Sequence, residues 1–418
     1  MKRFISCCGA ALLTFGVSQP ARAQHDPAPA NPPDFTLHTE SDPGVETFAI
    51  HAQATYAWQG KPAFSSPYEG ENSLTGDRAH SDSTSVTVDA GARLWRGGEV
   101  HYNLEGAAGL PFSDLHGLGG MNNGELGKAA GKDIKFYNAR VFLRQTWNLG
   151  GESAAVAPDM NQLAGYQDAR RVVLTLGTIS VLDIFDSVSI SHDPRVQFMN
   201  WSFLTHGSYD YAADARGYSR GATLEYEDGD WAVRFGRYAM PIESNGETLD
   251  NRIMTHYGDQ LELEKSYSLW GRARTARLLV FRNQIITGSF DDAIADAATH
   301  GGAPDVAHVR HLQDKRGAGL SVEQVLGDNL SAFARINFAD GRTETYAFAE
   351  IDHAISGGIA ISGNAWNRAR DSFGLAVAFN GLSAAHQRYL QLGGVGAFLG
   401  DGTLDYGTER VLEMYYNW

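Results

Sequence analysis

The stretch FYNARVFLRQTW, residues 136–147, decides the fold class. Along it, apolar side chains such as Val141 and Leu143 alternate with polar side chains that include Arg140 and Arg144. Successive side chains of a β-strand point to opposite faces of the sheet. The stretch therefore predicts a strand with one apolar face and one charged face.

Two aromatic residues, Tyr137 and Trp147, share the apolar parity and bracket this stretch. At about 3.3 Å per residue and a tilt near 40°, their spacing covers roughly 25 Å, which is the height of the lipid-facing band of an outer-membrane barrel. Aromatic girdles flank that band at both interfaces. We expect the apolar face, with Tyr137, to contact lipid and the arginine face to contact water, because an Arg at the bilayer midplane costs roughly 2–4 kcal/mol.

The first 23 residues indicate the compartment. A short basic head and an apolar run over residues 4–17 precede a small-x-small cleavage site that ends at Ala23. This pattern predicts a secretory signal peptide over residues 1–23, which is removed from the mature protein. Both cysteines lie inside it, so the mature chain is expected to have no disulfide.

The composition narrows the class of protein. Apolar residues make up 43% of the chain, too few for a helical membrane protein, while 47 glycines and 11% aromatics fit a barrel whose strands each turn one face to water. The formal net charge of −15 argues against nucleic acid as a partner, because a polyanion is repelled by an acidic protein. No motif requires a cofactor.

The remaining chain divides into a Pro-rich lead-in over residues 24–45 and an all-β transmembrane antiparallel β-barrel over residues 46–418, with about 14–16 strands. The expected strands are residues 48–59, 85–94, 99–106, 136–147, 171–178, 217–227, 231–238, 257–265, 275–283, 315–325, 329–338, 344–353, 357–363, 373–380 and 409–418. Tight links such as residues 227–230 alternate with long polar loops such as residues 150–167 and 288–314. Short periplasmic turns and longer extracellular loops are the layout of outer-membrane barrels.

Several segments resemble the carbohydrate-selective porins of the OprB type. The most specific, LDIFDSVSISHDPRVQFMNWSF at residues 182–203, is similar to that family's Asp-Pro-Arg-x-Gln-Phe-Met-Asn-Trp signature. Residues 51–74, 93–109, 349–383 and 389–418 resemble other family segments. The resemblance implies a closed barrel of sixteen strands that passes monosaccharides, glucose above all, across the outer membrane.

The end of the chain departs from that family. A further hairpin is expected after residues 413–416, but the sequence ends at Trp418. Leu412, Met414 and Tyr416 alternate before the terminal aromatic, which resembles an outer-membrane assembly signal. The chain is either a shortened barrel or a truncated copy that lacks a closing hairpin, and we favour truncation.

Motifs for catalysis are weak. Residues 217–221 match the G-x-S-x-G nucleophile elbow, but an alternating hairpin follows instead of a helix. His308 and His311 lack a third metal ligand at suitable spacing, and Glu262 and Glu264 are more typical of pore-facing charges than of glycosidase acids. A channel is therefore favoured over an enzyme. The alternative is a secreted periplasmic β-rich carbohydrate-binding protein or glycoside hydrolase, which does not explain the aromatic spacing.

A sugar-selective constriction needs Arg and carboxylate groups beside aromatic faces. Inward parity and the signature segment, which resembles a loop folded into the lumen, nominate ten pore-lining, substrate-binding residues: Arg93, His101, Asn103, Glu105, Arg140, Arg144, Asp193, Arg195, Asn200 and Trp201. For each strand Arg an internal salt bridge that braces the wall is an equal alternative. For Trp201 a packed loop anchor is favoured over a stacking platform.

The expected partners are mono- or small oligosaccharides, outer-membrane lipid and the outer-membrane assembly machinery. The sequence leaves open whether barrels associate into a homo-oligomer. It also leaves open which sugar passes.

Overall fold

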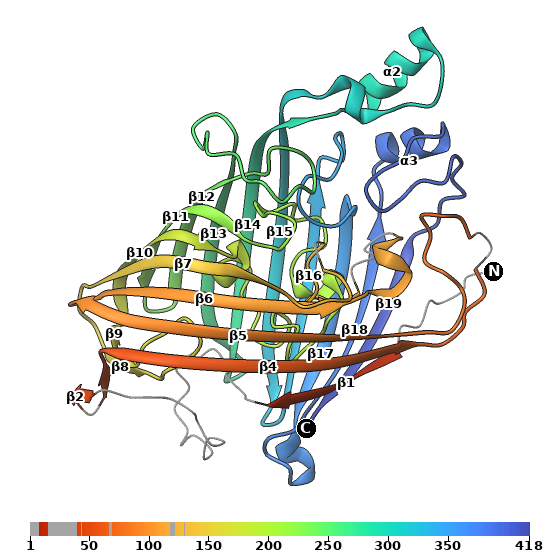
Figure 1. Cartoon of the computed structure of the whole chain (residues 1–418). Helices are drawn as coiled ribbons and strands as arrows, with labels where there is room; N and C mark the ends of the chain where they lie inside the picture. The colour runs from red at the N-terminus through yellow and green to blue at the C-terminus, as the bar shows by residue number, and fades with distance from the viewer. Residues whose placement is uncertain (1–7, 16–39, 43, 67–68, 118–121, 129) are drawn as a thin grey trace.

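The computed structural model describes residues 8–15, 40–42, 44–66, 69–117, 122–128 and 130–418 (Figure 1). Fourteen strands form one sheet in which each strand pairs antiparallel with the next along the chain. These strands are β4 Phe48–Lys61, β5 Ala79–Trp95, β6 Gly98–Gly109, β7 Lys135–Asn148, β10 Arg170–Ile179, β11 Ser219–Asp228, β12 Trp231–Ala239, β13 Tyr257–Leu269, β14 Arg272–Thr287, β15 His311–Gly327, β16 Leu330–Ala339, β17 His353–Ser362, β18 Ser372–Gly381 and β19 Glu409–Asn417. The predicted all-β antiparallel barrel is confirmed.

A fifteenth strand, β1 Cys8–Phe15, lies between the two edge strands of this sheet. It pairs antiparallel with β4 and parallel with β19, so the ring is completed through β1. Among the residues that the structure describes, β4 and β19 do not pair with each other. β1 falls inside the predicted signal peptide, whose cleavage stays a prediction.

The other elements are small. Two-stranded sheets form from β2 Glu40–Asp42 with β3 Val45–Glu46 and from β8 Ser153–Val156 with β9 Gly165–Asp168. The helices are α1 Trp201–Leu204, α2 Phe290–His300 and α3 Ala384–Gln391, with 3₁₀ turns η1 Phe112–Leu115, η2 Val181–Asp183, η3 Val306–Val309 and η4 Gly363–Trp366. Most of the predicted lead-in, residues 24–39 and 43, lies outside the described residues. No helix in the described part of the chain is long and apolar enough to cross a membrane.

The two ends of the barrel differ. Tight turns join β5 to β6, β11 to β12, β13 to β14 and β15 to β16 at one end, which we call the turn end. Long connections join β4 to β5, β6 to β7, β10 to β11, β12 to β13, β14 to β15, β16 to β17 and β18 to β19 at the opposite loop end, where α2 and α3 lie (Figure 1). Residues 363–371, which carry η4, join β17 to β18 at the turn end. One long segment breaks the expected layout: residues 149–169 join β7 to β10 at the turn end and carry the β8–β9 hairpin. The prediction that residues 150–167 form a loop on the long-loop side was therefore wrong.

The strands alternate as the sequence predicts. On β13, Leu261 and Leu263 are exposed by 38% and 41%, whereas Glu262 and Glu264 between them are buried. Because a strand alternates sides, apolar side chains face outward to lipid and charged ones face the interior.

The deciding strand, β7, contains a β-bulge at Ala139. Asn103 of β6 pairs with Arg140, but the next residue, Leu104, pairs with Asn138, so Ala139 is an extra residue. On the C-terminal side of the bulge, Val141 is 48% exposed and faces outward, as predicted. An extra residue reverses the face to which each side chain points on the other side of the bulge.

The bulge overturns the predicted placement of Tyr137. Its hydroxyl donates to the Glu105 carboxylate at 2.5 Å, inside the barrel. Phe136 instead faces outward, with 59% of its surface exposed, and takes the girdle position opposite Trp147. The prediction that Tyr137 faces lipid was wrong because strict alternation does not include a bulge.

The predicted strand at residues 344–353 was also wrong, because residues 344–352 form a loop and β17 begins at His353. The backbone N–H groups of Tyr346, Ala347 and Phe348 donate to the carboxylate of Asp210 at 2.9, 2.7 and 3.0 Å. A side chain thus satisfies backbone donors that a sheet ladder would otherwise occupy.

Candidate functional site

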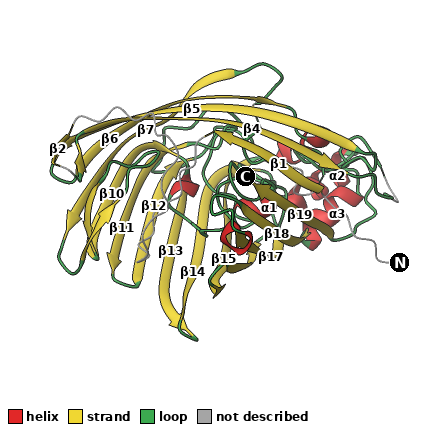
Figure 2. Cartoon of the chain, turned by 90° about the horizontal axis from the view of Figure 1, so that it is seen from below, coloured by secondary structure: helices red, strands yellow, loops and turns green. Residues whose placement is uncertain are grey.

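The connection from β10 to β11 folds into the barrel, and we call residues 180–218 the lumen loop. Figure 2 shows the sheet bent around an interior that holds loops and α1. On the far wall, Arg335 of β16 donates through Nε to Asp186 of the lumen loop at 2.8 Å. Glu413 of β19 accepts the backbone N–H of Asn200 at 2.9 Å. The lumen loop thus crosses from β10 to β19, and its predicted position in the lumen is confirmed.

Short polar side chains set the local shape of the lumen loop. The Asp193 carboxylate accepts the backbone N–H of Arg195 at 2.8 Å, which is an Asx turn. Asn200 is the N-cap of α1, and its side-chain oxygen accepts the N–H of Ser202 at 2.9 Å. The first motif fixes the backbone of the Asp-Pro-Arg segment at residues 193–195 and so orients Arg195. The second fixes the backbone at the start of α1.

Arg195 joins the lumen loop to the early strands. Its guanidinium donates to Glu125 at 2.7 Å and to Glu105 at 2.8 Å, and it also reaches Gln53 at 3.0 Å and Thr87 at 3.1 Å. Burial alone would lower the pKa of Arg195, but the Glu125 and Glu105 charges raise it above its usual value, so the group stays cationic. Burial raises the pKa of the Glu125 carboxyl, although Arg195 opposes that effect. Arg195 keeps 16% of its side chain exposed.

Glu105 is a hub of these contacts. Besides Arg195, its carboxylate accepts the hydroxyls of Tyr137 at 2.5 Å, Tyr218 at 2.7 Å and Thr87 at 2.9 Å. The group is buried, and its contacts are all with protein donors. Glu105 therefore holds the Arg195 guanidinium in position.

Arg140 pairs with the start of the lumen loop. Its Nε and Nη2 atoms donate to the two carboxylate oxygens of Asp183, both at 2.8 Å, in a bidentate pair. Its guanidinium also lies 5.1 Å from the centre of the Tyr218 ring. The side chain is 14% exposed, so Arg140 faces the interior, as predicted.

Arg144 and Arg93 lie nearer the turn end. Arg144 donates through Nη1 to Glu99 at 3.1 Å and to the Asn161 carbonyl at 2.8 Å, and its side chain is 22% exposed. Arg93 donates to two backbone carbonyls, those of Glu46 at 3.0 Å and Ala164 at 3.1 Å. Arg93 thus holds β3 and the residues just before β9 against the inner wall, and Arg144 holds the segment before β9.

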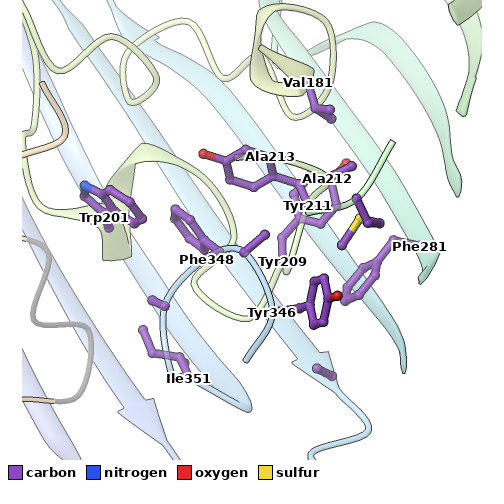
Figure 3. Close-up of a cluster of buried hydrophobic side chains, with 14 of the residues drawn as sticks. Val181, Trp201, Tyr209, Tyr211, Ala212, Ala213, Phe281, Tyr346, Phe348 and Ile351 are labelled. Carbon is purple, nitrogen blue, oxygen red and sulfur yellow. The ribbon is translucent and has the colours of Figure 1, made fainter. Parts of the chain in front are cut away.

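Five of the predicted pore-lining residues are buried in protein: His101, Asn103, Glu105, Asn200 and Trp201. His101 and Asn103 both contact the Asp89 carboxylate, at 3.2 and 2.6 Å. Trp201 stacks on Phe348 with ring centres 4.7 Å apart, within a buried cluster (Figure 3). These five side chains do not line a free surface, and for Trp201 the packed-anchor alternative is the one that the structure shows. Arg93, Arg140, Arg144, Asp193 and Arg195 remain partly exposed.

A second set of interior charges, of which sequence reasoning singled out only Glu262 and Glu264, is called the inner ladder: Glu225, Arg234, Glu262, Glu264, Arg277 and Glu323. Arg234 donates to Glu262 at 2.9 Å and to Glu264 at 3.1 Å. Arg277 continues the ladder to Glu264 at 2.9 Å and Glu323 at 2.8 Å. The inward parity of these residues is visible in the sequence, but their mutual pairing depends on strand register.

Among the described residues, no group of three or more His, Cys, Asp or Glu side chains is arranged to hold a metal ion. The polar interior is instead built from arginine–carboxylate pairs. Such pairs offer hydrogen-bond donors and acceptors to a polar solute.

The sequence matches one known protein family over most of its length. Residues 77–418 match the family described as carbohydrate-selective porin, OprB family. The chain belongs to this family. It is therefore a sugar channel of the Gram-negative outer membrane and not an enzyme, which removes the alternative of a secreted carbohydrate-binding protein or glycoside hydrolase.

One solved structure supports the fold. A high-pH structure of Pseudomonas putida OprB is 15% identical, covers 89% of this chain and 85% of its own, and has a TM-score of 0.64. A low-pH structure of the same protein is 12% identical, with coverage of 81% and 77% and a TM-score of 0.42. Salmonella typhi OmpF is 9% identical, with coverage of 90% and 98% and a TM-score of 0.38. No curated protein sequence matches the chain significantly.

Proposed function

We propose that this OprB-family channel passes monosaccharides of the glucose type by passive diffusion into the periplasm. The observation that carries the proposal is the lumen loop, which Arg195 fixes to the early strands and Arg335 fixes to the far wall. A loop held on both sides of a barrel narrows the path and presents charged groups along it.

The partly exposed arginines supply the recognition chemistry. A sugar presents hydroxyl donors and acceptors around a weakly apolar ring, and each guanidinium carries five N–H donors. Arg144 makes both of its bonds through Nη1. The rest of its guanidinium is oriented by these bonds and can donate to a sugar hydroxyl. Arg140 is held in the same way by its bidentate pair with Asp183.

The test is a planar-bilayer recording with glucose titrated into the wild type and the Arg140→Ala variant. A lost charge-assisted hydrogen bond of about 1.5 kcal/mol should weaken the apparent glucose affinity roughly tenfold and raise small-ion conductance. Arg272→Ala, an exposed side chain at the turn end that pairs with Asp328, is the matched control and should leave glucose block unchanged. Unchanged block in Arg140→Ala with a lower melting temperature would assign Arg140 a bracing role only.

We also propose that residues 1–23 are removed on export and that residues 46–418 are inserted by the outer-membrane assembly machinery. Removal would take β1 away with the signal peptide, and with it the strand that links β4 to β19. Mass spectrometry of the outer-membrane protein should find Gln24 as the first residue. Native gels and chemical cross-linking in detergent would establish whether the barrels form a homo-oligomer.

A further inference from the structure

A row of charged side chains crosses the outward face of β12–β15 near the loop end. Arg237 pairs across strands with Asp259, Asp259 with Arg282, and Arg282 with Arg316. These residues have the outward parity, because their chain neighbours Tyr238, Gln260 and Asn283 are fully buried in the interior. We call Arg237, Asp259, Arg282, Asp314 and Arg316 the arginine row.

The arginine row lies directly at the edge of the apolar band. Two residues closer to the turn end, Phe235, Leu261 and Val280 pair across the same strands and are exposed by 46%, 38% and 39%. Long loops mark the extracellular end of an outer-membrane barrel. The arginine row therefore lies at the height where the acyl chains of the outer leaflet end and its headgroups begin.

The charges of the row are only partly neutralised by protein. Arg237 pairs with Asp259 at 2.7 Å, while Arg282 and Arg316 share Asp314 at 3.0 and 2.9 Å. Three guanidiniums thus share two carboxylates. The side chains of Arg282 and Arg316 are still 45% and 65% exposed.

Arg282 and Arg316 lie directly opposite each other on β14 and β15, and both guanidiniums bond the same carboxylate, that of Asp314. Like charges directly opposite each other on neighbouring strands destabilise a sheet. Near this contact, Asp340 accepts the backbone N–H of Arg316, and exposed Arg342 adds another cation. Exposed Arg220 on β11 adds a further cation on the same outward face. An anion at this position would relieve the repulsion and use the outward-facing N–H donors.

We propose that the arginine row binds the phosphate group of a phosphorylated glycolipid of the outer leaflet, such as lipopolysaccharide. Guanidinium groups bind phosphate through two parallel hydrogen bonds, a geometry that lysine cannot supply. The acyl chains of the same lipid would cover Phe235, Leu261 and Val280 below the row. The proposal uses the outer-membrane location of the family and is independent of which sugar passes.

The experiment measures binding of rough-type lipopolysaccharide to the purified barrel in detergent by native mass spectrometry. The double variant Arg282→Gln/Arg316→Gln should bind about tenfold more weakly, a loss of about 1.4 kcal/mol, because it removes both guanidiniums that would contact the phosphate. The control Arg272→Gln makes the same change at the other end of β14, where Arg272 pairs with Asp328, and should bind as the wild type does. Heat-modifiable gel mobility would verify that each variant is a folded barrel.

Two further arms separate phosphate recognition from general attraction. Dephosphorylated lipopolysaccharide should bind the wild type no better than the intact lipid binds the double variant. Arg282→Lys/Arg316→Lys, which keeps the charge but loses the planar pair of donors, should fall between the wild type and the Gln variant. Wild-type affinity in the Gln double variant, or an equal loss in Arg272→Gln, would overturn the proposal.

Discussion

The interior of the barrel contains two sets of arginines that look alike in the sequence. Arg140, Arg144 and Arg195 are 14%, 22% and 16% exposed, and we call them the open arginines. Arg234, Arg277 and Arg335, the sealed arginines, are 7%, 0% and 0% exposed. Both sets are paired with carboxylates, so pairing alone does not separate them.

The two sets differ in whether water and solute can reach the guanidinium groups. A buried arginine that solvent and solute do not reach can only hold the wall and the loops together. A partly exposed arginine keeps donors that a solute can use. The comparison predicts that changes in the sealed set alter stability, whereas changes in the open set alter conductance and sugar block.

The largest effect is expected for Arg335→Ala. Arg335 bonds Asp186, the Ser191 carbonyl and the Phe203 carbonyl at 2.7–2.8 Å, and its removal leaves the Asp186 charge buried. Breaking one partner of a buried ion pair costs about 3–5 kcal/mol. Thermal unfolding followed by heat-modifiable mobility should show a large drop in melting temperature, while exposed Arg272→Ala should change it little. Equal stability of Arg335→Ala and the wild type would remove the distinction between the sets.

Acid should weaken the same contacts in two steps. Burial by itself would raise the pKa of Asp186, but the charges of Arg335 and His206 lower it to about 2, so this stabilisation is present above pH 3.8 and is lost as the pH falls toward 2. Burial lowers the pKa of His206 to about 4. As the pH falls, this imidazole is therefore protonated near pH 6.5 in the unfolded chain but only near pH 4 in the folded chain. The His206 step should lower the unfolding free energy by about 3 kcal/mol and the Asp186 step by about 2 kcal/mol as the pH falls. Denaturant titrations across this range would show it, and His206→Gln should abolish only the step between pH 6.5 and 4.

Arg195→Ala tests the open set at its most connected member. Its four partners lose a shared donor, so the lumen loop should loosen on the side of β4–β6. We expect glucose block to weaken about tenfold, from a loss of about 1.4 kcal/mol, with higher ion conductance in planar bilayers. Arg195→Lys should restore conductance more than sugar block, because lysine keeps the charge without the fork of donors. Unchanged glucose block in Arg195→Ala would show that Arg195 only holds the structure together, as the sealed arginines are expected to do.

Arg144→Gln should give the smallest change. Arg144 makes one ion pair, with Glu99, and is the most exposed of the three open arginines. Because this pair is partly exposed to water, it should contribute no more than about 1 kcal/mol, so stability should hardly change and glucose block should weaken at most about fivefold. A melting-temperature loss as large as that of Arg335→Ala would show that exposure does not separate the two sets.

The sequence by itself determined the fold class and the faces of most strands. Alternation along β13, with Leu261 and Leu263 out and Glu262 and Glu264 in, is a local signal that needs no distant partner. The signature at residues 182–203 likewise predicted the family and a loop in the lumen, both of which were confirmed.

Only the tertiary structure decided the details that depend on residues far apart in the chain. The bulge at Ala139, which turns Tyr137 inward, is defined by the register of β7 against β6. Residues 344–352 leave the sheet because Asp210, over 130 residues away, binds their backbone N–H groups. Which arginines are sealed depends on the segments packed over them, as the lumen loop covers Arg335. Period-two alternation reports which side of a strand a residue faces, whereas burial of that side depends on long-range packing that no local pattern encodes.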